Sequence, residues 1–283
     1  MLEDKLENEM NGYDDDDIIL PDDVWEEIFL QCDVETINKI ATVSKDWNQI
    51  ISSSIFWKRK LVKQQVFLPQ DVIQSERLNW KVLRSFCRTL SKHKVLPYNV
   101  NLIQNASGEL ETDPDKLLLG NRNEVDFDEY WFQHWFIWSS GGQGWRLFKE
   151  DDLTYFAASY ISCTKSQTVD LVKRGVDPVI LDEYQPEITI KDHWSHCRNH
   201  AGVYELKVKL MNAEMREVTG FSRRVLISAD DPEEWRSVDH VFSEYGGGVR
   251  FVELYHGGMS DDMEEGWQGP RMRQSTVTIQ WPR

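Results

Sequence analysis

Hydrophobic positions recur at helical spacing near the start of the chain. A start signal at Pro21, followed by two aspartates, predicts a first helix that ends near Asp33. Its apolar positions are Val24, Trp25, Ile28 and Phe29. A second helix is predicted over Val34 to Val43, and a third begins at Asp46 and continues to Ile51. Three short helices in about 40 residues cannot bury all of this apolar surface alone, so a partner helix is expected.

The segment that follows is predicted to connect the N-terminal helices to the rest of the chain. Residues 58 to 93 are basic and carry apolar residues at helical spacing, which predicts a helical linker that ends near residue 95. Residues 106 to 130 combine turn-forming and acidic residues without a sustained period, so an insertion or long loop is expected there.

From Trp131 onward the pattern changes to that of short β-strands. Strands are predicted at 135–138, 155–163, 188–190, 204–210, 224–228, 237–242, 249–255 and 275–281. Turn signals separate them and few amphipathic helices intervene, which is typical of a β-sandwich. The segment from Tyr255 to Trp267 (YHGGMSDDMEEGW) lies between the last two strands and is interpreted as a glycine-framed loop that faces a ligand.

Length and charge narrow the function classes. The 283 residues favour about two domains. A net charge of −16 argues against binding to nucleic acid or to an anionic membrane, since both need a basic face. Residues 1 to 17 lie in a strongly acidic stretch and are expected to be a disordered tail. With no long apolar run, no signal-peptide pattern and four scattered cysteines, a cytoplasmic protein with reduced thiols and no membrane insertion is expected.

The segment from residue 18 to 60 resembles an F-box, the module that docks on the Skp-type adaptor of a cullin-based ubiquitin ligase. If the resemblance holds, its apolar side chains contact the adaptor or orient the residues that do, and the adaptor links the chain to a cullin and a RING subunit. The residues that carry the match are Leu20, Pro21, Val24, Ile28, Ile40, Val43, Trp47 and Trp57. From the residues alone, an ordinary helical core remains the alternative.

A second resemblance covers residues 135 to 283, which are similar to the F-box-associated domain of the sugar-recognising F-box proteins. Its motifs include GGQGWR at 141–146, YFAASY at 155–160, KDHW at 191–194 and HGG at 256–258. It implies an α+β multidomain protein in which a helical F-box and helical linker precede an antiparallel jelly-roll-like β-sandwich. The expected bounds are 1–17 for the tail, 18–60 for the F-box, 61–95 for the linker, 96–130 for the insertion and 131–283 for the sandwich.

The resemblance also implies a ligand site in the loops at one end of the sandwich. Glycan-binding members hold an inner chitobiose there with a Tyr-Trp pair that is usually followed by Lys or Ala, and this chain has Met263, Glu264 and Glu265 at those three positions. Loss of one ring stack alone removes about 1 kcal/mol or more. Other candidate contacts are Phe148 and the run His193, Trp194 and Ser195, with Phe148 and Trp194 packed in the core as the alternative.

The histidine-rich segment after residue 192 is a candidate metal site or an exposed polar loop. His193, His196, Cys197 and His200 resemble a metal-ligand cluster in composition, but their spacing fits no standard zinc signature. No G-x-S-x-G, P-loop or H-E-x-x-H pattern occurs. We therefore expect no metal, no cofactor and no catalytic residue, and a metal-dependent enzyme that uses the His193 to His200 loop remains a remote alternative.

Together these patterns indicate a non-catalytic substrate-recognition subunit of a Skp–cullin–F-box ubiquitin ligase. Two hypotheses remain for what the sandwich selects. One is N-glycans on misfolded glycoproteins that enter endoplasmic-reticulum-associated degradation. The other is a protein substrate, bound by a domain that has lost N-glycan recognition. In both, tethering a substrate beside the ligase raises its effective concentration.

Overall fold

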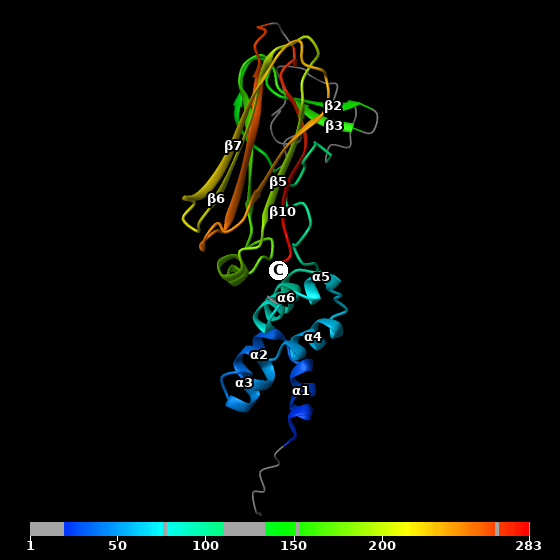
Figure 1. Cartoon of the computed structure of the whole chain (residues 1–283), viewed down its shortest axis with the longest axis vertical. Helices are drawn as coiled ribbons and strands as arrows, with labels where there is room; N and C mark the ends of the chain where they lie inside the picture. Colours follow the sequence, from blue (N-terminus) through cyan, green and yellow to red (C-terminus); the bar gives the residue numbers. More distant parts are fainter. Residues whose placement is uncertain (1–19, 76–77, 110–133, 151–152, 264–265, 283) are drawn as a thin grey trace, which may run out of the picture. The chain divides into compact units, whose positions relative to one another are not determined.

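The computed structural model describes residues 20–75, 78–109, 134–150, 153–263 and 266–282. The chain divides into two compact units, Met1–Phe67 and Leu68–Arg283 (Figure 1). Among the described helices, none is long and apolar enough to cross a bilayer. Each unit is described by itself below.

The described part of the first unit, which we call the helical unit, contains four helices: α1 (Asp22–Gln31), α2 (Val34–Ile40), α3 (Lys45–Ile51) and α4 (Ser54–Lys63). Side-chain oxygens of Asp33, Ser44 and Ser53 accept backbone N–H groups at the starts of the last three, which satisfies donors that a helix leaves unpaired. The three helices predicted from residues 21 to 51 are confirmed.

The core of the helical unit is aromatic and aliphatic. Trp47 contacts Trp25 and Phe29 at ring distances of 4.7 and 5.5 Å, so α3 packs on α1 through three rings. Lys60 of α4 is buried, and its Nζ donates to the carbonyl oxygens of Leu30 and Cys32 at the end of α1. A cation at these carbonyls neutralises the negative end of the helix.

The described strands of the second unit form two antiparallel five-stranded sheets, which confirm the predicted sandwich (Figure 1). Sheet B has the order β1 (Phe136–Ser140), β4 (Cys163–Asp170), β9 (Phe251–Ser260), β6 (Gly202–Met211) and β7 (Glu217–Ile227). Sheet A has the order β2 (Arg146–Glu150), β3 (Leu153–Ala157), β10 (Arg271–Ile279), β5 (Ile188–Ser195) and β8 (Arg236–Phe242).

The connector is divided differently from the prediction. Instead of one helical stretch over residues 58 to 93, the structure has α4, a short α5 (Gln70–Ile73) and α6 (Trp80–Lys92). Pro69 precedes α5, and Asn79 caps α6 by accepting from two backbone N–H groups, so proline and capping residues interrupt the helical pattern.

Helix α6 packs against the sandwich within the second unit. The ring of Phe86 lies 5.4 Å from Tyr98 and 5.5 Å from Trp281, and Tyr98 lies 4.9 Å from Trp281. The hydroxyl of Thr89 donates to the carbonyl oxygen of Gly175 at 2.7 Å. The segment that follows α6 also joins the sandwich, because the Leu102 N–H donates to the carbonyl oxygen of Val277 in β10.

The interpretation of residues 255 to 267 as one loop is wrong for its first half. Strand β9 continues to Ser260, and both Gly257 and Gly258 are buried within it. A Cβ at Gly257 would collide with the Cys163 carbonyl oxygen, and one at Gly258 with the Val203 carbonyl oxygen. These glycines therefore serve close approach of neighbouring strands rather than a turn.

Candidate functional site

The predicted adaptor-contact residues on α1 and α2 lie largely at the surface of the helical unit. Val24 and Ile28 are one turn apart on α1 and are 38% and 42% exposed, and Val43 beyond α2 is 69% exposed. Pro21 is exposed, while Leu20 and Ile40 are half-buried. Exposed aliphatic side chains beside a packed aromatic core are what helix-in-groove recognition uses.

The two tryptophans of the same set have a different place. Trp57 has no exposed surface, and its Nε1 donates to the Ile51 carbonyl oxygen at 2.7 Å. Trp47 is half-buried under α1. Trp57 can therefore orient the helices but cannot contact a partner, and Trp47 supports α1 from below.

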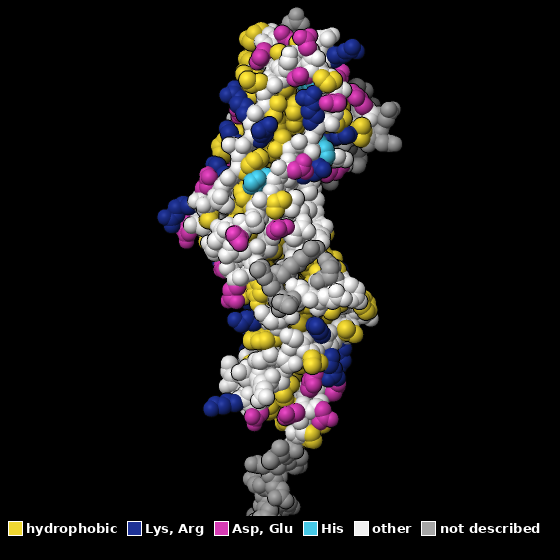
Figure 2. Space-filling model, in the orientation of Figure 1, with side chains coloured by type: hydrophobic (Ala, Val, Ile, Leu, Met, Phe, Trp, Pro, Cys, Tyr) yellow, Lys and Arg dark blue, Asp and Glu magenta, His cyan; other side chains and the backbone are white. Residues whose placement is uncertain are grey.

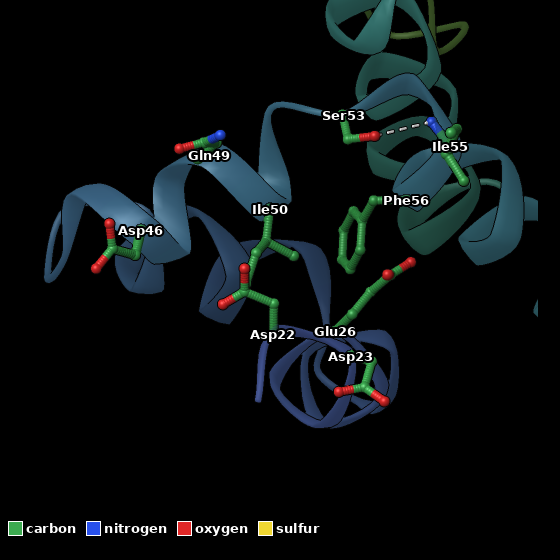
Figure 3. A pocket seen from close by; sticks show the side chains of 9 residues that line it. All are labelled: Asp22, Asp23, Glu26, Asp46, Gln49, Ile50, Ser53, Ile55 and Phe56. Carbon is green, nitrogen blue, oxygen red and sulfur yellow. Dashed lines mark hydrogen bonds between the residues drawn. The ribbon is translucent and has the colours of Figure 1, made fainter. Parts of the chain in front are cut away.

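The helical unit also has a hollow of about 630 Å³ between α1 and the α3–α4 region. Figure 3 shows Ile50 and Phe56 pointing into it, while Asp22, Asp23 and Glu26 come from α1. None of the eight predicted adaptor contacts lines it. The hollow and the exposed Val24–Ile28 stripe are thus distinct features of the unit.

At the sandwich, the loop after β9 carries the predicted ligand residues. Met263 is 73% exposed, and Glu264 and Glu265 lie outside the described residues. The base of the loop is tied down, because the Asp261 N–H donates to the Ala201 carbonyl oxygen and Asp262 lies 2.7 Å from His200 Nδ1. The Met263 side chain therefore extends into solvent beyond this tied base.

The run His193, Trp194 and Ser195 is part of strand β5 rather than a loop, which corrects the sequence interpretation. Consecutive residues of a strand point to opposite faces. Trp194 faces the core at 3% exposure and stacks on Tyr204 at 5.2 Å and 14°, whereas His193 lies on the outer face of sheet A. The two rings therefore cannot hold one ligand together.

Phe148 lies on β2, on the outer face of sheet A. Its ring stacks on Tyr155 of β3 at 5.4 Å, and the guanidinium of Arg146 lies 5.0 Å from the ring. Tyr155 donates to Glu150 at 2.5 Å, and burial together with that carboxylate raises the pKa of Tyr155 above its usual range. The Phe148 ring thus already contacts an aromatic ring and a guanidinium of the protein itself.

Sequence reasoning missed the arginines around these rings. Arg146 lies 4.5 Å from the Trp267 ring, and Arg273 lies 4.0 Å from the Trp235 ring. Burial lowers the pKa of Arg273, and its Nε and Nη1 have no hydrogen-bond acceptor within the described parts of the chain. Arg271 and Arg273 are two residues apart, so both side chains lie on one face of β10. This spacing was the signal in the sequence that could have indicated a shared arginine surface.

The histidine-rich segment does not converge on one point. His196 Nε2 lies 3.2 Å from the Asp231 carbonyl oxygen, while His200 pairs with Asp262. Burial lowers the pKa of His193, which lies on β5. Over the described ranges, no three His, Cys, Asp or Glu side chains are placed to hold a metal ion.

A buried polar cluster joins the two sheets. Asp192 of β5 accepts from Tyr204 at 2.6 Å and from Ser275 at 2.6 Å, and lies 2.9 Å from His256 Nδ1. Lys165 of β4 is buried close by, with its Nζ 4.0 Å from the centre of the Trp135 ring. Burial lowers the pKa of Lys165 well below its usual range. These groups have no exposed surface, so they stabilise the fold rather than form a site.

Comparison with known proteins gives matches to both units. A family model described as the F-box domain matches residues 18–59, and one described as the F-box associated region matches residues 94–279. The sandwich also matches the structure of TmCBM61 in complex with β-1,4-galactotriose, at 13% identity over 64% of this chain and all of that chain, with a TM-score of 0.37. A likeness this remote supports no conclusion about ligands.

Curated relatives match over most of the chain. F-box only protein 17 of Homo sapiens is 33% identical over 267 residues, which are 86% of this chain and 84% of that protein. F-box only protein 2 of Bos taurus is 30% identical, with coverage of 83% and 73%, and F-box only protein 44 of Mus musculus is 28% identical, with coverage of 92% and 95%. The chain belongs to the family of F-box proteins that carry an F-box associated region.

Proposed function

We propose that this protein is the non-catalytic substrate receptor of a Skp–cullin–F-box ubiquitin ligase. The observation that carries the proposal is the exposed aliphatic stripe of Val24 and Ile28 on α1. The stripe lies over a packed core and within the residues that match the F-box model. In this role the helical unit binds a Skp-type adaptor, and through it a cullin and a RING subunit. The sandwich binds the substrate and raises its concentration beside the ligase.

For the sandwich we favour selection of a protein substrate over an N-glycan. A sugar ring is held by stacking on a free aromatic face and by hydrogen bonds to its hydroxyls. At the loop end Met263 is exposed in place of an aromatic ring, Phe148 is already in contact with the Tyr155 ring and the Arg146 guanidinium, and Trp194 is in the core. The arginines near Trp235 and Trp267 suit acidic and aromatic side chains of a protein surface better than a neutral sugar.

Adaptor binding is tested by mixing the purified full chain with a purified Skp-type adaptor. Ile28→Asp should weaken co-purification about tenfold or more, because it places a charge in an apolar contact. Val62→Asp is the matched control, since Val62 is 61% exposed on α4 and is not among the predicted contacts. Equal binding by wild type and Ile28→Asp would show that the ligase assignment of this face is wrong.

The substrate class is tested by titration with chitobiose. The wild type is expected to show no binding at millimolar sugar. A double variant with Met263→Tyr and Glu264→Trp, which restores the aromatic pair of glycan-binding relatives, is expected to gain binding if the loop retains its place. Saturable binding by the wild type would favour glycan selection and contradict the protein-substrate proposal.

A further inference from the structure

The two sheets of the sandwich end side by side at strands β7 and β8. β7 is the last strand of sheet B and β8 the last strand of sheet A, with no further strand beyond either in the described part of the chain. The ring of Phe221 on β7 stacks on His240 of β8 at 4.1 Å, which shows that the two edges face each other. We call the space between these edges the seam.

The seam contains a hollow with an apolar base. Its volume is about 570 Å³, and its apolar lining consists of Trp194, Phe221, Val225 and Val238. Figure 2 shows hydrophobic side chains gathered in a streak along this side of the sandwich, with Lys and Arg side chains beside it. Trp194 is the deepest of these residues, at 3% exposure.

The lining residues occupy inward-facing positions that the fold leaves half covered. Phe221 pairs with Val208, and Val225 pairs with Tyr204, both of which are buried residues of β6. Val238 likewise pairs with the buried Asp192 of β5. Phe221, Val225 and Val238 nevertheless remain half-exposed, so the core is incomplete along this side.

Two arginines also take inward-facing positions at the seam. Arg223 pairs across the sheet with the buried Leu206, and Arg236 pairs with Trp194. Arg236 lies 5.4 Å from the Trp194 ring and 3.2 Å from Glu234. No carboxylate in the described ranges forms an ion pair with Arg223.

The only carboxylate among the lining residues already has other partners. Asp239 accepts from Ser237 at 2.6 Å and lies 3.6 Å from Lys191. The seam is therefore locally positive at Arg223 on a chain whose net charge is −16. An apolar hollow beside an uncompensated guanidinium fits a ligand with apolar and acidic side chains.

We propose that the seam is a docking site for an extended peptide segment that alternates apolar and acidic residues. Its backbone pairs with the free edge of β7, as an added strand does in β-augmentation. Its apolar side chains enter the hollow over Trp194, and an acidic side chain reaches Arg223 and Arg236. The 11 residues of β7 provide the length for such pairing. A second copy of this chain fits less well, since seam-to-seam contact would bring like charges together.

This inference does not require adaptor binding, so it can be tested on the purified full chain alone. The probe is a fluorescein-labelled ten-residue peptide in which aspartate alternates with valine and one central phenylalanine, and anisotropy reports binding. Arg223→Glu is expected to weaken binding about tenfold or more. Arg224→Glu is the matched control, because it is the next residue of β7, faces the opposite side and pairs with Glu205 at 3.3 Å. It should change the affinity less than about twofold.

Two further probes separate strand addition from simple charge attraction. The same peptide with lysine in place of aspartate should not bind, and a version with alternate backbone N-methyl groups should lose binding because it cannot pair with β7. Absence of binding by the aspartate peptide, or equal loss in Arg223→Glu and Arg224→Glu, would overturn the proposal. So would a concentration-dependent dimer of the wild type that Val238→Asp dissolves, because a second copy would then be the occupant. Circular dichroism of each variant verifies that the sandwich is intact.

Discussion

The Nδ1 atom of His256 lies 2.9 Å from Oδ2 of Asp192, and neither side chain has any exposed surface. The two residues come from different sheets, β9 and β5, so the contact connects the two layers in the middle of the core. Burying such groups costs free energy unless each is hydrogen-bonded, and here the Tyr204 and Ser275 hydroxyls supply the remaining bonds to the carboxylate.

This arrangement predicts that stability falls as the solution is acidified below neutral pH. Burial lowers the pKa of His256, and Lys165 adds to this effect while Asp192 opposes it. Burial also lowers the pKa values of His193 and His240. Between the lowered folded values and the unfolded value of about 6.5, the unfolded chain binds more protons, so the free energy of unfolding decreases as the pH drops.

The measurement is denaturant unfolding at pH 7.5, 6.5 and 5.5. His256→Asn is the comparison, since an amide can donate to Asp192 but does not titrate, and its pH dependence should be shallower. The carboxylate does not interfere in this window. Burial acts to raise the pKa of Asp192, but His256 and the hydroxyl donors outweigh it and leave that pKa lowered, so its contribution is lost only below about 3.8. Identical stability at all three pH values would contradict the assignment.

Removing the charge of Asp192 should destabilise the sandwich strongly. Asp192→Asn leaves at least one of its donors without an acceptor and removes a counter-charge near Lys165, so we expect a loss of about 2–4 kcal/mol in the free energy of unfolding. Asp239→Asn is the surface control, because its ion pair with Lys191 is exposed and should be worth less than about 1 kcal/mol. Equal effects of the two substitutions in a urea titration would argue against a structural role for the buried cluster.

Replacing a glycine by alanine should lower the free energy of unfolding where strands approach closely, as at Gly257 and Gly258, and not where space is open. Gly258→Ala places a Cβ against the Val203 carbonyl oxygen and the Pro270 ring, so strands β9 and β6 must separate. We expect a loss of about 1–3 kcal/mol or more. Gly247→Ala meets only Asp182 atoms at 3.7 Å or beyond, which is ordinary contact, and should be tolerated. Thermal unfolding of the two variants compares them directly.

Substitutions at Trp57 and Val43 should distinguish residues that stabilise the helical unit from residues that bind its partner. Trp57→Ala removes a fully buried ring and its hydrogen bond to Ile51, at a cost of about 3–5 kcal/mol. Val43→Asp changes a side chain that is largely exposed and should alter stability by less than about 0.5 kcal/mol while weakening adaptor binding. A Val43→Asp variant that binds the adaptor as the wild type does would remove Val43 from the proposed contact surface.

Local signals in the sequence predicted most of the elements but not the faces they present. Pro21 with two aspartates predicted the start of the first helix, helical spacing of apolar residues predicted all three helices, and short strands separated by turn signals predicted the sandwich. The Gly257–Gly258 pair was misread because a glycine pair signals a turn and close strand approach equally well. Trp194 was predicted to lie in a loop, because the polar HWSH run does not show that the preceding strand extends through it to Ser195.

Neither the seam nor the contact between Arg146 and Trp267 was predictable from local patterns. Arg223 and Arg236 are 13 positions apart and meet the same hollow only because β7 and β8 end different sheets on the same side. Likewise, Arg146 and Trp267 come together through strand order rather than sequence spacing. Such relationships depend on topology, which a periodicity in one segment does not contain.

The packing of Phe86 against Trp281 has a consequence for how the protein is made. Helix α6 leaves the ribosome roughly 200 residues before the aromatic ring on which it rests, an interval on the order of ten to forty seconds at ordinary elongation rates. Throughout that interval the apolar face of α6 lacks this partner. Nascent chains stalled before Trp281 should therefore be recognised by chaperones at α6, and release of the helix should follow the emergence of Trp281 from the ribosome.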